Sequence, residues 1–208
     1  MPLARPPVLR FLLGDRPGLI FRVSGVDARA LSVHAGSINL YGALPWAGGQ
    51  ALARYVLDHP DTVAGRRVLD LATGGGLVAI AAGRAGAARV CAYDVDPLSG
   101  AATTLNASLN RSAVTVTVAD PLDGDPDEAD VILAGDVFYS RQMASRVLDF
   151  LDRARRRGVD VLVGDPGRAY LPRERFAPVA VYDVPVSRAL ESADSKRTTV
   201  WRLAHGPR

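Results

Sequence analysis

An acid, a glycine cluster and a second acid follow one another within residues 66–96, in a spacing that suits a nucleoside-containing ligand. Asp70 lies in a short apolar run just before Gly74-Gly75-Gly76, and Asp94 ends a second apolar run twenty positions after Gly74. Glycine permits a sharp turn and a close backbone approach, and a helix beginning near Gly76 directs unpaired N–H groups at the ligand. A carboxylate at Asp94 can accept from both ribose hydroxyls. The stretch predicts a strand, turn, helix and strand with a cofactor pocket at the turn; an ordinary turn without a ligand is the alternative.

Asp70 favours one class of cofactor over another. Residues 74–79 also fit G-x-G-x-x-A, a dinucleotide fingerprint. A pyrophosphate is anionic, however, and a carboxylate beside it is unfavourable. S-adenosylmethionine has no phosphate and carries a sulfonium and an ammonium, which an acid at Asp70 suits. We therefore predict S-adenosylmethionine, with NAD(P) as the alternative.

Two more acids follow predicted strands. The apolar run Val131 to Ala134 is typical of a central parallel strand, and Asp136 and Tyr139 come directly after it. Ligands of open α/β sheets bind at that end, so both residues are expected to face the methyl donor. The alternative for Asp136 is the N-cap of the next helix. Asp120, after the strand Val114–Val118, is expected to accept from the adenine amine, with Leu122 against the ring; a plain loop acid is the alternative.

Two further segments have competing interpretations. Trp46-Ala47-Gly48-Gly49-Gln50 precedes a helix within residues 45–60. It forms either the lip of the cofactor pocket or a buried tryptophan beside a flexible helix start. The acidic residues 123–130 lack the glycine and distant glutamate of a calcium-binding EF-hand, so we expect a solvated loop and no metal site.

The remaining pattern predicts an α/β fold. Asp96-Pro97 is typical of a helix start, and helices are expected to about Asn110 and over 141–157, the second ending in an arginine cluster that we expect to be solvated. A strand is expected over 159–163, and residues 176–184 and 197–204 are expected to form an antiparallel hairpin. Near the N-terminus, residues 1–18 are expected to be irregular at first, followed by short strands over 20–26 and 30–33.

The composition of the chain limits the kinds of partner that we expect. A chain of 208 residues with 48% hydrophobic content suits one domain with a real core. The net charge of +3 gives little support for nucleic-acid binding. A signal-like segment and an apolar run of about 18 residues are both lacking, so a cytoplasmic protein without membrane contact is expected.

The motifs WAGGQALARYVLDHP, VLDLATGGG, CAYDVDP, GDVFY, VGDPGR and TTVW occur in order between about residues 41 and 203. Together they resemble the electron transfer flavoprotein beta-subunit lysine methyltransferase family. The resemblance implies a Rossmann-like sheet of seven mostly parallel strands with helices on both faces, S-adenosylmethionine as donor, and lysine as acceptor. The family's acid-x-x-aromatic motif falls on Asp136 and Tyr139, and its Trp-x-Gly-Gly-Gln segment starts at Trp46. Ala72 stands where the family has its first loop glycine.

The resemblance divides the chain into an N-terminal extension, residues 1–40, which does not match clearly, and a methyltransferase domain, residues 41–208. It implies a protein partner, with the flavoprotein beta subunit as one candidate, and we expect a monomer. Asp136 is expected to bind and orient the acceptor ammonium, and Tyr139 to shape an aromatic channel. The alternatives are a methyltransferase of a ribosomal protein or small amine, an NAD(P)-dependent oxidoreductase, and a non-catalytic cofactor-binding module.

Overall fold

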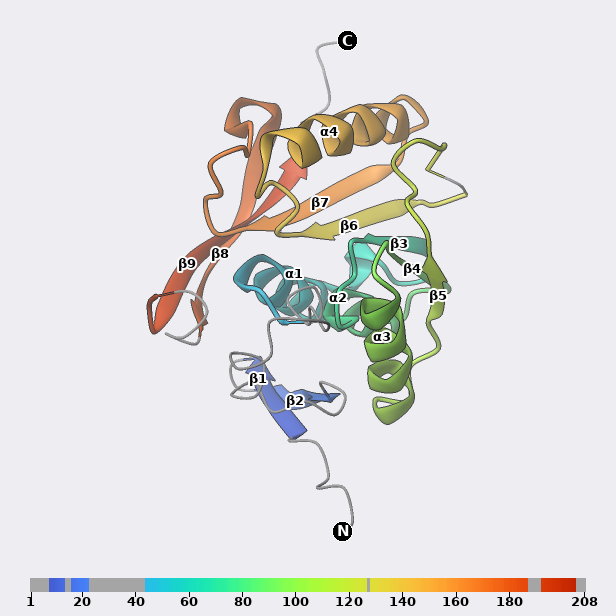
Figure 1. Ribbon diagram of the computed structural model, residues 1–208, viewed down its shortest axis with the longest axis vertical. Coiled ribbons are helices and arrows are strands. Elements are labelled where there is room, and N and C mark those ends of the chain that lie inside the picture. The colour runs from blue at the N-terminus through green and yellow to red at the C-terminus, as the bar shows by residue number, and fades with distance from the viewer. Residues whose placement is uncertain (1–7, 14–15, 23–43, 127, 187–191, 205–208) are drawn as a thin grey trace, which may run out of the picture.

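Seven strands form one sheet in the computed structural model, which describes residues 8–13, 16–22, 44–126, 128–186 and 192–204 (Figure 1). The strand order is β5-β4-β3-β6-β7-β9-β8. Strands β3 to β7 run parallel, whereas β9 is antiparallel to β7 and to β8. The strands are β3 (Arg67–Leu71), β4 (Arg89–Asp94), β5 (Thr115–Val118), β6 (Val131–Gly135), β7 (Asp160–Asp165), β8 (Phe176–Pro185) and β9 (Ser195–Leu203).

Helices cover both faces of the sheet, as the resemblance implies. The helices α1 (Ala47–Asp58), α2 (Leu77–Arg84) and α3 (Pro97–Leu109) lie on one face, and α4 (Arg141–Arg156) lies on the other (Figure 1). Two cores follow from this layering. One joins α1 and α2 to the sheet through residues such as Leu52 and Ile80, and the other joins α4 to it through Phe138 and Phe150. Short 3-10 turns, η2 (Pro60–Thr62) and η3 (Arg173–Arg175), complete the connections.

The helix ends explain most of the predicted boundaries. Asp96 caps α3 by accepting from the amide of Leu98, and Pro97 occupies the first helical position, as expected. Ser140 caps α4 by accepting from the amide of Met143. Asp136 is therefore not the cap of the helix that follows it. Trp46, at the start of α1, offers no side-chain cap of its own.

The N-terminal prediction was wrong in its placement. Strands β1 (Val8–Leu13) and β2 (Arg16–Arg22) form a separate two-stranded antiparallel sheet, so the first strand lies where an irregular segment was expected. The expected strand over 30–33 lies outside the described residues. The physical reason is in the sequence, where Gly14-Asp15 is a turn signal between two apolar runs, VLRFLL and GLIF.

Candidate active site

A cleft of about 590 Å³ opens at the carboxyl ends of the parallel strands. A smaller cavity of about 50 Å³ adjoins it beneath the glycine loop. The two share four lining residues: Trp46, Ala72, Gly135 and Asp136. The larger volume lies within the usual range for a ligand pocket, about 300–1,000 Å³. The cleft is therefore large enough for one nucleoside-sized ligand with an acceptor group beside it.

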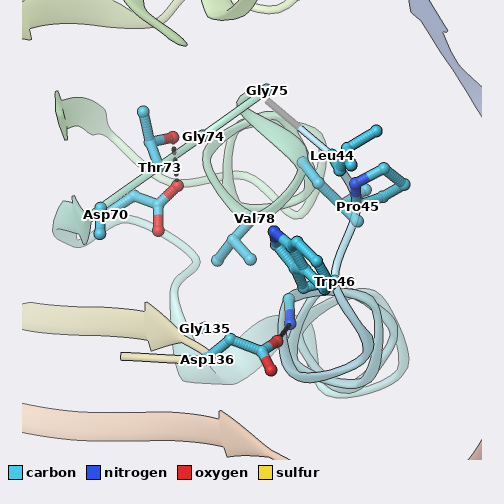
Figure 2. Close-up of a pocket in the computed structure, with 13 residues that line it drawn as sticks. Leu44, Pro45, Trp46, Asp70, Thr73, Gly74, Gly75, Val78, Gly135 and Asp136 are labelled. Atoms are coloured by element: carbon cyan, nitrogen blue, oxygen red, sulfur yellow. Dashed lines mark hydrogen bonds between the residues drawn. The ribbon is translucent and has the colours of Figure 1, made fainter. Parts of the chain in front are cut away.

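The glycine loop between β3 and α2 forms one wall of the site (Figure 2). Gly74 and Gly76 adopt positive φ angles of 57° and 83°, the left-handed region that suits glycine. From α3, the hydroxyl of Thr103 donates to the Gly74 carbonyl at 2.9 Å, and the side-chain amide of Asn106 donates to the Gly75 carbonyl at 2.7 Å. Two buried polar residues of α3 thus fix the shape of the loop.

Asp70 lies at the floor of the smaller cavity, buried to 1% exposure (Figure 2). Its carboxylate accepts from the Thr73 hydroxyl at 2.6 Å and from the Ala79 amide at 3.0 Å. Burial raises the pKa of Asp70 to about 7, although both hydrogen bonds oppose the rise. The side chain therefore changes charge near neutral pH, and a cation placed beside it would favour the ionised form.

Asp94 connects the glycine loop to the end of β4. One carboxylate oxygen accepts from the Gly74 amide at 2.9 Å, and the other accepts from the Asp96 amide at 3.0 Å. Asp94 and Asp96 both line the larger cleft. The carboxylate is thus held in a fixed position at the edge where the sequence predicted a contact with a ribose.

Asp120 and Leu122 line the opposite side of the same cleft. The Asp120 carboxylate accepts from the Leu122 amide at 2.9 Å and from the guanidinium of Arg146 at 2.8 Å. Burial alone would raise the pKa of Asp120, but these two contacts outweigh it and hold the pKa below its usual value. Leu122 is buried to 4% exposure, which places an apolar side chain beside a carboxylate that is ionised at neutral pH. This pairing suits the edge and face of a purine.

The arginines at the end of α4 hold this part of the cleft in place. Arg153 donates to the carbonyls of Leu122 and Gly124, and Arg157 pairs with Asp125 at 2.6 Å. The expectation of a merely solvated arginine cluster was therefore incomplete. The acidic segment faces arginines as well, because Asp123 pairs with Arg146, while Glu128 and Asp130 pair with Arg67. Among the described residues, no group of three or more His, Cys, Asp or Glu side chains is arranged to hold a metal.

Trp46 and the two glycines after it bring α1 against the ends of β6 and β7. A Cβ on Gly48 would lie 2.2 Å from the Gly164 carbonyl oxygen, and a Cβ on Gly135 would lie 2.8 Å from the Gly49 Cα. The glycine pair therefore serves close helix–sheet packing, while Trp46 lines both cavities, as the lip interpretation predicted. We call Gly48, Gly49, Gly135 and Gly164 the glycine seam.

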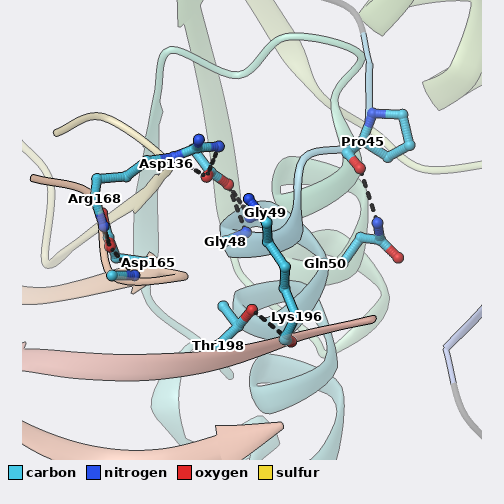
Figure 3. A network of polar contacts seen from close by, with 10 residues as sticks. Pro45, Gly48, Gly49, Gln50, Asp136, Asp165, Arg168, Lys196 and Thr198 are labelled. Carbon is cyan, nitrogen blue, oxygen red and sulfur yellow. Dashed lines mark hydrogen bonds and ion pairs between the residues drawn. The ribbon is translucent and has the colours of Figure 1, made fainter. Parts of the chain in front are cut away.

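Asp136 lies at the centre of a polar network between these elements (Figure 3). Its Oδ2 accepts from the amides of Gly48 and Gly49 at 2.5 and 3.2 Å, so the carboxylate caps α1 from across the chain. Its Oδ1 accepts from the Nε and Nη2 of Arg168 at 3.0 and 2.7 Å. Asp136 adopts a φ of 56°, unusual for a residue with a side chain, as often seen at functional sites. Burial raises the pKa of Asp136, although Arg168 opposes the rise.

Tyr139 stands at the rim of the cleft with 62% of its surface exposed. Met143, in the first turn of α4, lines the same wall. The tyrosine is thus available to a molecule that enters the cleft from solvent, as a channel-forming residue must be.

Eight of the nine sequence-predicted site residues line the two adjoining cavities, and the ninth, Gly76, follows directly on the lining residue Gly75; the eight are Trp46, Asp70, Gly74, Asp94, Asp120, Leu122, Asp136 and Tyr139. Sequence reasoning missed Arg168, Arg146, Thr73 and the two α3 residues that hold the loop. Only Arg168 had a signal, because it follows Gly164-Asp165-Pro166-Gly167 at the end of a strand.

Comparisons with known proteins agree with this geometry. Residues 50–138 match the family model described as ribosomal protein L11 methyltransferase (PrmA). Among solved structures, the magnesium protoporphyrin IX methyltransferase of Synechocystis PCC 6803 with bound SAM is 13% identical and has a TM-score of 0.57, covering 82% of this chain and 87% of that one. The ribosomal protein L11 methylase of Lactobacillus delbrueckii subsp. bulgaricus is 22% identical, with a TM-score of 0.52 and coverage of 76% and 79%. Both similarities concern the fold.

Curated relatives are more similar in sequence. The electron transfer flavoprotein beta subunit lysine methyltransferases of Homo sapiens and Danio rerio are 39% and 41% identical, each over more than three quarters of this chain. The chain covers 64% and 65% of those two relatives, slightly less than two thirds of their length. The Xenopus laevis protein of the same name is 41% identical, over 77% of this chain and 68% of its own length. The chain therefore belongs to the electron transfer flavoprotein beta subunit lysine methyltransferase family.

Proposed function

We propose that the chain is an S-adenosylmethionine-dependent methyltransferase that methylates a lysine side chain of a protein acceptor, with the beta subunit of electron transfer flavoprotein as the favoured acceptor. One observation carries the donor assignment: the buried carboxylate of Asp70 lies under the same turn that presents Gly74 and Gly75 to the cavity. A pyrophosphate at this turn would face that negative charge, whereas a cationic methionine group would be stabilised by it. This favours the methyl donor over NAD(P).

The residues divide the cleft into three parts for the donor. Asp94 would accept from the ribose hydroxyls, and Asp120 with Leu122 would hold the adenine. Asp70, Thr73 and Trp46 would surround the methionine end beneath the glycine loop. When bound, S-adenosylmethionine supplies an activated methyl group on a sulfonium. The chain's own task is then to hold the acceptor nitrogen in line with that methyl, an effect worth up to about 7–11 kcal/mol in favourable cases.

The acceptor end of the cleft is formed by Asp136 and Tyr139. A lysine must lose a proton before it can attack, and from a pKa of about 10.4 this costs about 4.6 kcal/mol at pH 7. Asp136 has four N–H donors on its two oxygens, so it contacts an acceptor nitrogen directly only when Arg168 moves away. We assign Tyr139 to the wall of the channel, where its ring attracts the cationic groups of donor and product. The proton leaves to water.

A second acceptor has a specific observation in its favour. Residues 50–138 match the ribosomal protein L11 methyltransferase model, and a relative of that name from Geobacillus thermodenitrificans is 44% identical over 87 residues. That similarity covers only 41% of this chain. The relatives named for the flavoprotein match over about twice that length, which favours the flavoprotein acceptor.

The test is methyl transfer with two acceptors side by side. Purified chain and S-adenosylmethionine carrying a labelled methyl are incubated with electron transfer flavoprotein or with ribosomal protein L11, both from the same source as the chain. Lys196 is the only lysine of the chain, so Lys196→Arg allows lysine self-labelling to be subtracted. Asp94→Ala serves as the donor-site control.

Label on a lysine of the flavoprotein beta subunit, lost with Asp94→Ala, is the expected result. Label on L11 alone would replace the acceptor and keep the reaction. Donor binding by calorimetry without label on either protein would favour a non-catalytic module, and NAD(P) binding in place of S-adenosylmethionine would overturn the proposal. We also propose that the enzyme acts as a cytoplasmic monomer without nucleic-acid or membrane partners. In the part of the chain described, no helix is long and apolar enough to cross a membrane.

A further inference from the structure

Arg168 neutralises the Asp136 carboxylate, which faces the acceptor end of the cleft. Its guanidinium makes two hydrogen bonds to the Oδ1 of Asp136, at 2.7 and 3.0 Å, and the side chains of the pair are 24% and 8% exposed. Both residues line the cleft. A two-bond pair of this kind holds a carboxylate in one orientation more firmly than a single contact does.

Further contacts fix the position of Arg168. Its backbone amide donates to Asp165 at 2.6 Å, and Asp165 also accepts from the Gly167 amide (Figure 3). Its guanidinium lies 5.7 Å from the centre of the Trp46 ring. The arginine is therefore held between the end of β7, the lip of the cleft and Asp136, with its charge directed into the site.

The Asp136 carboxylate has no capacity left for a further donor. A carboxylate offers about four acceptor positions, and the amides of Gly48 and Gly49 use the two that Arg168 does not. An ammonium that enters the cleft therefore meets a pair without net charge. An unpaired carboxylate would stabilise the ammonium and oppose loss of its proton, whereas a nearby cation favours the neutral amine.

We propose, on the basis of the function proposed above, that Arg168 is a positioning residue which keeps the acceptor end free of net negative charge, so that the entering lysine is favoured as the neutral nucleophile. This matters because only about one free lysine side chain in 2,500 is neutral at pH 7. Arg168 acts through Asp136 and through its own charge, and it forms no bond in the reaction.

Other charged or titratable groups face the same space, and the variants tested below leave these residues in place. They are Asp70 from β3, Asp94 and Asp96 from β4 and the residues after it, Asp120 after β5, Tyr139 from the β6–α4 connection, Arg146 from α4, Asp165 from the end of β7 and Arg173 from η3. Variants at positions 136 and 168 keep these side chains in place and change the net charge of the pair.

The experiment varies the net charge of the Asp136–Arg168 pair and measures how the rate of methyl transfer depends on pH. Arg168→Gln gives the pair a charge of −1, the wild type and the double variant Asp136→Asn/Arg168→Gln give 0, and Asp136→Asn gives +1. Single-turnover methyl transfer to purified electron transfer flavoprotein, at saturating donor, is measured from pH 6.5 to 10. Arg156→Gln removes an exposed arginine of α4 that does not line the cleft and is the control.

The rising limb of the pH–rate profile should move by about one pH unit for each unit of net charge on the pair, to higher pH when the pair is more negative. Arg168→Gln should be about tenfold slower than wild type at pH 7.5, with the deficit closing towards pH 10. The double variant should return to the wild-type profile, Asp136→Asn should move to lower pH, and Arg156→Gln should not move. If Arg168→Gln fails to fold, the inference is still tested by whether the pH–rate profile of Asp136→Asn moves to lower or to higher pH than that of the wild type.

Three outcomes would overturn the inference. A deficit in Arg168→Gln of the same size at every pH would mean a purely structural role. A lower KM for the acceptor without displacement of the profile would mean that Arg168 competes with the lysine for Asp136. A profile of Asp136→Asn that stays in place or moves to higher pH would exclude charge compensation. The proposed function fails separately, because it predicts transfer by the wild type.

Discussion

The backbone amide of Gly74 donates to the carboxylate of Asp94 at 2.9 Å, joining the turn after β3 to the end of β4. We expect Asp94→Ala to lower the affinity for S-adenosylmethionine about 10- to 100-fold, because hydrogen bonds to a charged group contribute roughly 1.5–3 kcal/mol. Calorimetric titration measures the effect directly. Asp61→Ala, an exposed acid in η2, is the control and should bind as the wild type does. Unchanged affinity in Asp94→Ala would contradict the ribose assignment.

Gly76 and Gly65 form a matched pair that separates backbone strain from crowding. Both have positive φ, but a Cβ on Gly76 would lie 2.8 Å from the Thr103 Cγ2, whereas one on Gly65 meets nothing within 4 Å. Gly65→Ala should cost about 1–2 kcal/mol of unfolding free energy from the left-handed backbone alone. Gly76→Ala should cost about 2–4 kcal/mol, since overpacking adds to it. Urea unfolding of both variants tests the difference, and equal losses would show that Thr103 moves aside freely.

Asp70 should make the stability of the protein depend on pH. Its pKa is about 7 in the folded chain against an ordinary value of 3.8, so the folded state binds the proton more tightly than the unfolded state does. The contribution of this group to stability is therefore full below about pH 4 and is lost as the pH rises to about 7, by about 4 kcal/mol in all. Asp70→Asn should unfold at a higher temperature than the wild type at pH 8.5, with the difference vanishing towards pH 4.

The same substitution should weaken the donor site. Asp70→Asn removes the charge that a sulfonium and ammonium would favour, so its affinity for S-adenosylmethionine should fall. Binding to the wild type at pH 7 should release protons, because a bound cation lowers the pKa of Asp70. Calorimetry in two buffers of different ionisation enthalpy measures this release. Release that persists in Asp70→Asn would assign the proton to another group.

Arg153 should affect donor binding from outside the cleft. It donates to the carbonyls of Leu122 and Gly124 and so holds the segment that carries Asp120. We expect Arg153→Ala to lower donor affinity about 3- to 10-fold and to lower the melting temperature by a few degrees. Arg156→Ala, an exposed neighbour on the same helix, should change neither. A loss of stability without a loss of affinity would mean that the segment keeps its shape unaided.

The elements around the cleft could be predicted because their signals are local. Asp96-Pro97 marks a helix start, the run over 131–134 marks a covered strand, and the glycine cluster marks the turn. The partner of Asp136 could not be predicted, because it depends on groups 32 and 88 positions away in the chain. Capping of α1 is the clearest case, since the helix lacks a capping side chain of its own and is capped by the carboxylate of Asp136, the residue after β6.

The same reasoning explains the two weaker predictions. The arginine cluster of α4 has no local signal for its partners, which come from a segment about 30 residues earlier. The glycine pair after Trp46 suited either a ligand or a neighbouring backbone, and only the fold shows which surface approaches it. Contacts between residues that are far apart in the sequence therefore could not be predicted from spacing and composition.

The glycine seam has a consequence for any mutational survey of this protein. Main chain meets main chain there, since a Cβ on Gly164 would lie 2.0 Å from the Gly48 carbonyl oxygen, so even alanine has no room. Positions 48 and 164 would consequently score as intolerant in an activity screen, and they lie next to residues that line the candidate site. They would mimic catalytic residues although they contribute no functional group. A parallel readout of protein abundance distinguishes the two, because seam variants would be depleted from the cell while true active-site variants would accumulate as inactive folded protein.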